Sequence, residues 1–327
     1  MVKKIVALVG AIVCAGAAYQ AIGSRIDARR FPQRGRSVSI GAIRLNLDCS
    51  GAGSTTVVLL SGMSVPAIQW APVQSEVSRF TRVCSYDRAG YGWSDSGPEP
   101  RTSERIASEL HQLLAAAGER GPFLLVGHSF GGYNVRVFAA RFPEDCAGMV
   151  LVDASHGDEQ QRLYDVLPAD IRARERRDDE RQAWRERWLD PLLIYSGVER
   201  MRTNLSPELF YLESQRKAFR AVEAEDRAEA ESWKQVLAAG GIGDRPLIVL
   251  TAGEPYEYDP HLTAALAAAH RDLWIHDLQA STVRLSTRGK QIVVPGSGHM
   301  IPVDRPGAVI DAIREVRDTI LANRGTF

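Results

Sequence analysis

The stretch Leu124–Gly132, which reads L-L-V-G-H-S-F-G-G, decides the fold of this chain. The apolar run Phe123–Val126 leads into it, and a helix-like segment, Tyr133–Phe142, follows without a gap. A buried strand, a tight turn and a helix are therefore predicted, with Ser129 at the turn. The pattern G-x-S-x-G between a strand and a helix is typical of a nucleophile elbow.

The glycines of this turn have a physical role. A serine in such a turn adopts a strained backbone conformation, and larger neighbours would collide with the adjoining strand and helix. The turn projects the Ser129 hydroxyl above the sheet and leaves the Phe130 amide at a helix start, where partial positive charge favours an oxyanion. The same pattern occurs by chance in loops rich in Gly and Ser, but the flanking strand and helix favour a catalytic serine.

Composition narrows the classes of partner. The 327 residues include 40 basic and 40 acidic side chains, so the net charge is zero. The Arg-rich run 172–187 is interleaved with acids and predicts a solvated helix face, and we expect no nucleic-acid partner. A chain that is 45% hydrophobic can bury one large core, with or without an inserted subdomain.

The N-terminus reads as a targeting segment. Lys3 and Lys4 precede the apolar run Ile5–Tyr19, which can be extended to Ile22. This pattern predicts an export signal or a membrane anchor over residues 1–24, and hence an exported or membrane-anchored protein. An uncleaved anchor is slightly favoured, and an ordinary buried helix is the alternative. Basic residues lie on both sides of the run, so they do not fix an orientation in a membrane.

The rest of the chain alternates between strand and helix signals. The predicted strands span residues 37–40, 43–48, 55–60, 82–86, 123–126, 148–152, 246–250 and 291–294. The main predicted helices span residues 70–80, 102–117, 133–142, 262–278 and 306–323. This alternation favours a doubly wound, parallel sheet, and Gly41 between the first two strands predicts an antiparallel hairpin.

One long segment lacks strand signals. Residues 157–243 contain charged helical patterns, at 169–187, 208–222 and 224–239. We therefore predict a core made of residues 37–156 and 244–327, with 157–243 inserted as a helical cap. The insertion follows a strand, so it should lie over the carboxyl ends of the sheet, where ligands bind in such folds.

Four segments resemble the α/β-hydrolase fold. They are L-L-S-G-M, Y-D-R-A-G-Y-G-W-S, G-H-S-F-G-G and G-S-G-H, in the family's order, and the resemblance covers about residues 37–327. It implies a mostly parallel eight-stranded sheet with helices on both faces and an inserted cap. The family includes esterases, lipases and peptidases, and also dehalogenases and epoxide hydrolases, whose nucleophile is a carboxylate. Serine at position 129 argues against those last two.

A serine hydroxyl needs a base to become a nucleophile near neutral pH. His299 is the candidate, because it follows the last predicted strand in a Gly-rich loop and occupies the family's chain order of serine, acid, histidine. The alternative is a surface loop histidine. No pair among the seven histidines has a spacing such as H-E-x-x-H, and we predict neither a metal nor a cofactor.

The acid is less clearly marked. The family position after strand 246–250 carries Tyr256 where an aspartate is expected, and Glu257 or Asp259 would have to substitute. The other candidate is Asp153, at the carboxyl end of the strand after the elbow, where some family members keep their acid. We favour Asp153 and keep Glu257 and Asp259 as alternatives. A structural cap where the chain leaves the sheet is the non-catalytic interpretation of Asp153.

The resemblance also implies an oxyanion hole formed by the backbone amides of Phe130 and Met63. Ser61-Gly62 stands where many family members have His-Gly, so a histidine that supports this loop in them is absent here. The loop 87–94 resembles the family's D-x-x-G-x-G-x-S turn and is interpreted as a structural support below the site.

The two remaining alternatives concern cysteines and function. Cys49 and Cys84 lie in predicted strands, and they form either a disulfide or two small buried apolar residues. The favoured function is a serine hydrolase that cleaves a carboxylic ester or related acyl substrate through an acyl-enzyme. A non-catalytic binding protein on the same fold, or an acyltransferase, is the alternative. The substrate, the acyl-chain preference and the oligomeric state cannot be predicted from the sequence.

Overall fold

The computed structural model describes residues 2–254 and 262–324, which form two compact units. The larger unit contains Arg34–Val166 and Lys217–Phe327. The smaller unit contains Met1–Gln33 and Leu167–Arg216. The predicted insertion, 157–243, is thus divided between the two units, with its ends in the larger one.

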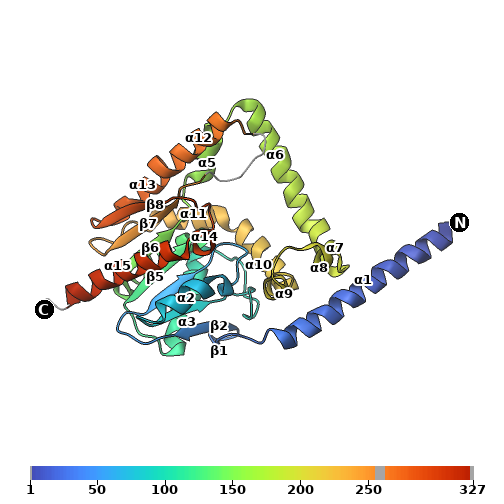
Figure 1. The fold of residues 1–327 in the computed structure, drawn as a ribbon, viewed down its shortest axis with the longest axis horizontal. Helices are drawn as coiled ribbons and strands as arrows, with labels where there is room; N and C mark the ends of the chain where they lie inside the picture. Colours follow the sequence, from blue (N-terminus) through green and yellow to red (C-terminus); the bar gives the residue numbers. More distant parts are fainter. Residues whose placement is uncertain (1, 255–261, 325–327) are drawn as a thin grey trace. The chain divides into compact units, whose positions relative to one another are not determined.

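The larger unit is organised around one eight-stranded sheet with the order β1-β2-β4-β3-β5-β6-β7-β8 (Figure 1). Its strands are β1 Arg36–Ser39, β2 Arg44–Ser50, β3 Val57–Leu60, β4 Val83–Tyr86, β5 Phe123–His128, β6 Cys146–Val152, β7 Leu247–Ala252 and β8 Gly289–Val294. Pairing is antiparallel from β1 to β2 and from β2 to β4, and parallel elsewhere. The mostly parallel eight-stranded sheet and the hairpin at Gly41 are confirmed.

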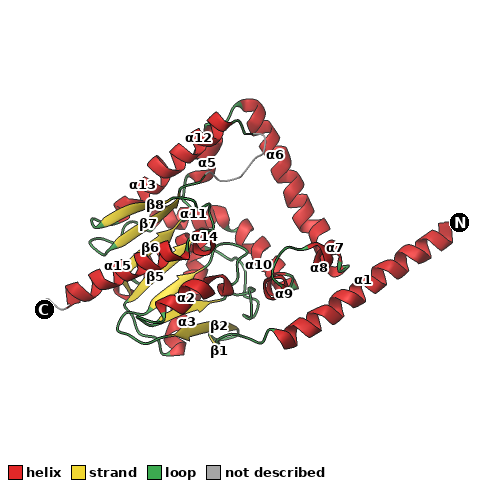
Figure 2. Ribbon diagram, in the orientation of Figure 1, coloured by secondary structure: helices red, strands yellow, loops and turns green. Residues whose placement is uncertain are grey.

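Helices cover both faces of the sheet (Figure 2). In the larger unit they are η1 Ala67–Trp70, α2 Ala71–Val77, α3 Ser103–Ala117, α4 Phe130–Arg141, η2 Pro143–Asp145, α5 Glu159–Asp165, α10 Arg216–Arg227, α11 Glu229–Ala238, α12 Ala264–Leu273, η4 Trp274–Gln279, α13 Ala280–Thr282, η5 Val283–Leu285, α14 Ile301–Asp304 and α15 Pro306–Arg324. Strand residues alternate between two buried clusters, because successive side chains point to opposite faces. Leu125 packs with Phe138 of α4 in one cluster, and Leu124 packs with Ile313 of α15 in the other.

The described residues of the smaller unit form helices joined by short loops, without a strand. It contains α1 Val2–Arg30, α6 Ala169–Trp184, η3 Arg185–Leu189, α7 Asp190–Tyr195, α8 Val198–Arg202 and α9 Pro207–Glu213. Arg200 ties α8 to α1, because its guanidinium donates to Asp27 Oδ2 at 2.6 Å and to Gln20 Oε1 at 2.9 Å. Phe31 stacks on Tyr211 at a centroid distance of 6.5 Å. Gln20 lies within the predicted targeting segment, residues 1–24, whereas Asp27 and Phe31 lie beyond it.

A membrane-spanning helix is not found in residues 2–254 or 262–324, because none of the helices there is both long enough and apolar enough to cross a bilayer.

Several helix predictions differ from the structure. The helix predicted over 208–222 is broken at Ser214 into α9 and α10. Four short helices were not predicted: α5, α7, α8 and α14, with four to seven residues each. Such segments span at most two turns, so an apolar repeat of 3.6 residues cannot establish itself within them.

Cys49 and Cys84 form a disulfide between β2 and β4. The two residues are direct partners in the antiparallel register of these strands. Of the two interpretations that the sequence left open, the structure supports the disulfide. Cys14 and Cys146 are free, the first exposed and the second buried.

Candidate active site

The elbow forms where β5 meets α4. Ser129 lies between them with φ 52° and ψ −126°, a conformation that L-residues rarely adopt. Its two glycine neighbours are sterically required: a Cβ on Gly127 would lie 2.5 Å from the Gly131 oxygen, and one on Gly131 would lie 2.4 Å from the Leu60 oxygen. The Ser129 carbonyl accepts the amide hydrogens of Gly132 and Ser155, at 2.8 and 3.1 Å. The strained turn is therefore fixed by its surroundings.

Asp153 lies directly after β6 and is fully buried, with φ 39°. Its Oδ1 accepts the Ala252 amide hydrogen and the Trp274 indole hydrogen, both at 2.9 Å. Its Oδ2 lies 2.8 Å from Nδ1 of His299. A buried carboxylate is costly unless it is hydrogen-bonded, and three donors satisfy this one. Asp153 is therefore oriented toward the imidazole with little freedom to rotate.

His299 lies in the loop between β8 and α14, with 19% of its side chain exposed. Because Nδ1 donates its hydrogen to Asp153, the neutral ring carries its lone pair on Nε2, as a general base requires. The ring packs against His128 at a centroid distance of 4.7 Å, and His128 directly precedes Ser129. The structure thus brings Asp153 and His299 into contact beside the elbow.

His128 fixes the loop that carries His299. Its Nε2 lies 2.9 Å from the His299 carbonyl oxygen and donates a hydrogen to it. The pKa of His128 is lowered from 6.5 to about 4, chiefly by burial and also by the positive charge that His299 can carry. A neutral His128 therefore anchors the backbone of His299 and does not take up a proton near neutral pH.

The loop between β3 and η1 runs beside the serine. A Cβ placed on Gly62 would lie 3.0 Å from Ser129 Cβ and 3.5 Å from its Oγ. Met63 is half-buried next to it, and Phe130 is buried at the first position of α4. The two predicted oxyanion donors therefore belong to segments that adjoin Ser129.

The predicted alternative acids, Glu257 and Asp259, lie outside the described residues, as does Tyr256.

Loop 87–94, which the sequence analysis interprets as a structural support, makes several hydrogen bonds through Asp87. This carboxylate accepts the side-chain amide of Asn46 at 2.9 Å and the backbone amides of Ala67 at 2.8 Å and Trp93 at 3.1 Å.

Sequence reasoning missed two contributors. Trp274 was assigned to a helix without a role at the site, although its indole binds Asp153. Glu225 lies in the charged insertion, and it pairs with Arg88 of the supporting loop at 2.8 Å. The only available signal for Glu225 was its spacing from Lys217 and Ala221, which places all three on one face of a helix.

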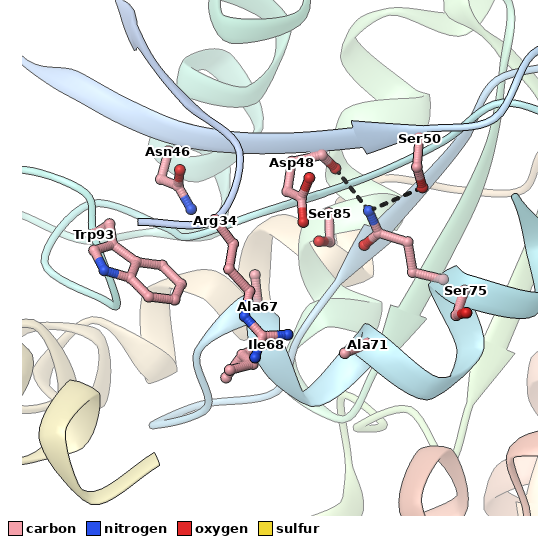
Figure 3. Close-up of a pocket in the computed structure, with 11 residues that line it drawn as sticks. Arg34, Asn46, Asp48, Ser50, Ala67, Ile68, Ala71, Ser75, Ser85 and Trp93 are labelled. Atoms are coloured by element: carbon pink, nitrogen blue, oxygen red, sulfur yellow. Dashed lines mark hydrogen bonds between the residues drawn. The ribbon is translucent and has the colours of Figure 1, made fainter. Parts of the chain in front are cut away.

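A separate polar pocket of about 200 Å³ lies between β2, β4 and α2 (Figure 3). Its lining includes Arg34, Asp48 and Trp93. None of the residues that line it is a predicted site residue, so it is distinct from the serine site.

In the described part of the chain, the one grouping of potential metal ligands is Cys49, Cys84 and Glu119, and its two sulfur atoms are joined in the disulfide.

Comparison with known proteins identifies the family. Residues 57–312 match the model of the alpha/beta hydrolase family, which is more than half of the chain. The chain therefore belongs to the alpha/beta hydrolase family, and its eight-stranded sheet agrees with that fold. The predicted membership in this family of enzymes is confirmed.

Individual relatives share a third or less of their aligned residues with this chain, or match only part of it. An uncharacterized protein of Bacillus subtilis, YqjL, is 33% identical over 108 residues, which is 33% of this chain and 43% of YqjL. The chain matches less than half the length of the first curated relatives. Cfl2 of Burkholderia cenocepacia has a TM-score of 0.59 at 21% identity, covering 87% of this chain and 95% of its own. An enol-lactonase of Burkholderia xenovorans LB400 has a TM-score of 0.55 at 16% identity, covering 86% and 100%.

The buried His128 predicts an acid-sensitive fold. The unfolded chain takes up a proton near pH 6.5, whereas folded His128 resists protonation until about pH 4. The free energy of unfolding should therefore fall as the pH drops from about 6.5 to 4, with His128 contributing about 3 kcal/mol of that loss. Urea unfolding at several pH values measures it. His128→Gln keeps an N–H donor and should flatten the curve, whereas His276→Gln, at an exposed position on η4, should leave it unchanged. An equally steep curve in both variants would contradict the assignment.

Proposed function

We propose that this chain is a serine hydrolase that cleaves a carboxylic ester or a related acyl substrate through a triad of Ser129, His299 and Asp153. The observation that carries the proposal is the 2.8 Å contact between His299 Nδ1 and the buried Asp153, next to a strained elbow serine. The non-catalytic alternative rested on the absence of an aspartate at position 256. Asp153 supplies a carboxylate from another strand, which favours the catalytic alternative.

The proposed reaction proceeds in two halves. Ser129 Oγ attacks the substrate carbonyl while His299 Nε2 takes its proton, and Asp153 stabilises the imidazolium that forms. The negative oxygen of the tetrahedral intermediate is bound by the amides of Phe130 and Met63. His299 returns the proton to the leaving alcohol, which leaves an acyl-enzyme. Water then attacks the acyl group while His299 takes its proton, and His299 passes this proton to Ser129 Oγ as the acid leaves, which restores the free serine.

Residues 157–243 are proposed to act as a cap that determines which acyl groups reach Ser129. Between Glu159 and Ala238 the described residues form helices and no strand, which supports this interpretation. A small-molecule acyl substrate is proposed because the chain belongs to a family of hydrolases. Transfer to an acceptor alcohol in place of water is the alternative outcome, and product analysis in the presence of added alcohols separates the two.

Labelling by a fluorophosphonate tests the nucleophile. Wild type should react covalently and hydrolyse p-nitrophenyl esters, and Ser129→Ala should lose the label and about 10⁴- to 10⁶-fold in kcat, because no other hydroxyl occupies the elbow. The matched control is Ser155→Ala, a neighbouring serine whose backbone amide binds the Ser129 carbonyl. Folded wild type that takes up no label and cleaves no ester contradicts the proposal.

Substitution of the carboxylates tests the acid. Asp153→Asn should lower kcat by about 10⁴-fold, because the histidine tautomer is lost. Glu257→Gln and Asp259→Asn should remain near wild type. Trp274→Phe removes one of three donors to Asp153 and should lower kcat on the order of tenfold. A large loss in Glu257→Gln or Asp259→Asn, together with an active Asp153→Asn, would reassign the acid.

We also propose that the folded domain functions outside the cytoplasm, with residues 1–24 as an export signal or a membrane anchor. The Cys49–Cys84 disulfide supports this, since such bonds persist in oxidising compartments. Alkylation of thiols in denaturant at cell lysis should modify the free Cys146, and Cys14 where residues 1–24 are retained, but not Cys49 or Cys84. Reduction should then lower the free energy of unfolding by about 2–4 kcal/mol, because the bond closes a chain loop. Cys14→Ser is the control for stability. Alkylation of Cys49 and Cys84 in freshly lysed cells would count against export.

A further inference from the structure

A buried ion pair joins helix α10 to the loop below the serine site. The guanidinium of Arg88 donates from Nε to Glu225 Oε1 at 2.8 Å and from Nη2 to Oε2 at 2.9 Å. The exposed fractions of the two side chains are 3% and 0%. Burying two charges is expensive, and the attraction between them offsets that cost only with good geometry and additional hydrogen bonds. The additional hydrogen bonds of this pair are made to the loop after β3, which runs beside Ser129.

Arg88 uses its remaining donors on that loop. Its Nη1 donates to the Ser61 carbonyl at 2.6 Å, and its Nη2 donates to the Gly62 carbonyl at 2.9 Å. The Tyr91 hydroxyl donates to Glu225 Oε2 at 2.7 Å and accepts the Ser64 amide hydrogen at 3.2 Å. Three backbone groups of residues 61–64, here called the oxyanion loop, are thus bound to one cluster.

The cluster has a defined protonation pattern. Burial raises the pKa of Tyr91 far above its ordinary value, and the Glu225 carboxylate raises it further. The phenol therefore keeps its single proton, which goes to Glu225, and its oxygen is left to accept from Ser64. Ser64 has φ 61°, a left-handed conformation that costs free energy for a residue with a side chain. The cluster holds the loop in this conformation.

The direction of the Met63 amide follows from peptide geometry. In a trans peptide the carbonyl of one residue and the N–H of the next point in opposite directions. Because Arg88 draws the Gly62 carbonyl to one side, the Met63 N–H is turned to the other side of the same peptide. Gly62 lies against Ser129, as its 3.0 Å Cβ approach indicates. In many family members a histidine after the strand supports this loop, and this chain has Ser61 there.

We propose that Glu225 is a positioning residue for the oxyanion hole, acting through Arg88 and Tyr91 to set the direction of the Met63 amide. This inference rests on the proposed hydrolase function. It gives α10 a second role besides covering the core: a helix of the inserted segment and the oxyanion loop are parts of one hydrogen-bonded unit.

The contact of α10 with the supporting loop extends over two helical turns. Lys217 Nζ donates to the Ser94 carbonyl at 2.7 Å. A Cβ on Gly90 would lie 2.4 Å from the Ala221 side chain, so only glycine allows this approach. Lys217, Ala221 and Glu225 are spaced four residues apart and lie on one face of α10. A shift of this helix therefore moves Glu225, and with it the support of the oxyanion loop.

The test is Glu225→Gln, which keeps the shape but removes the charge that orients Arg88. We expect kcat for p-nitrophenyl esters to fall about 10- to 100-fold with KM changed less than threefold, because an oxyanion donor acts in the transition state and one lost donor costs about 10²- to 10³-fold. Affinity for a boronic acid, which mimics the tetrahedral intermediate, should fall by the same factor as kcat/KM.

The matched control is Glu109→Gln, because Glu109 forms a similar bidentate buried pair with Arg101, at 2.6 and 2.8 Å, that has no contact with the oxyanion loop. Tyr91→Phe is the second variant if Glu225→Gln does not fold, and it should lower kcat about 3- to 10-fold. This inference alone is overturned if wild type is active and Glu225→Gln has the same kcat and boronic acid affinity as Glu109→Gln. It is also overturned if both values are unchanged in Tyr91→Phe. Wild type without ester hydrolysis and without fluorophosphonate labelling overturns the proposed function as well.

Discussion

The hydrogen bond between His299 and Asp153 is the interaction on which the rest of this structure depends. It joins the loop after β8 to the end of β6, across 146 positions of the sequence and across β7, the strand between them in the sheet. A buried carboxylate needs donors, and here the sheet itself supplies one through Ala252. The geometry of the site is therefore set by the parallel register of β6 and β7 as much as by the side chains themselves.

The parallel sheet explains why the candidate site residues lie at one edge of the sheet. Ser129, Asp153 and His299 each follow the carboxyl end of a strand, and parallel strands bring those ends together. The strain at Ser129 and Asp153, both with positive φ, lies at this same edge. Strained residues persist only where their surroundings fix them. The Ser155 amide donates to the Ser129 carbonyl, the Ala252 amide donates to the Asp153 carboxylate, and the Leu250 carbonyl accepts the Asp153 amide hydrogen.

The ion pair of Arg88 and Glu225 connects helix α10, in the proposed cap segment, to the loop 87–94. Glu225 comes from the helical segment that the sequence marks as different in composition, yet it is among the most deeply buried acids in the described residues. Its partner Arg88 holds carbonyls that border the serine. The boundary between core and insertion is thus a place where binding of a substrate and geometry of the site can be coupled, which is consistent with the proposed role of the insertion in selecting acyl groups.

The sequence by itself determined the fold and marked Ser129 and His299 as candidate site residues. The strand and helix around Ser129 are local, since a continuous apolar run, glycines and a following helix are all encoded within twenty residues. The alternation of strands and helices predicted the parallel sheet, and the position of His299 followed from chain order. These features depend on neighbours in sequence or on the family's pattern of motifs.

Only the tertiary structure decided which groups meet. Asp153 was one of three candidate acids, and its contact with His299 depends on the path of a loop from the far end of the chain. Trp274 carried no local signal and Glu225 only its helical spacing from Lys217 and Ala221, because the partners of both lie more than one hundred positions away. The disulfide was equally open until the register placed Cys49 opposite Cys84. Apolar periodicity encodes which face of an element is buried, whereas a hydrogen bond between distant side chains exists only once the packing of every element between them is fixed.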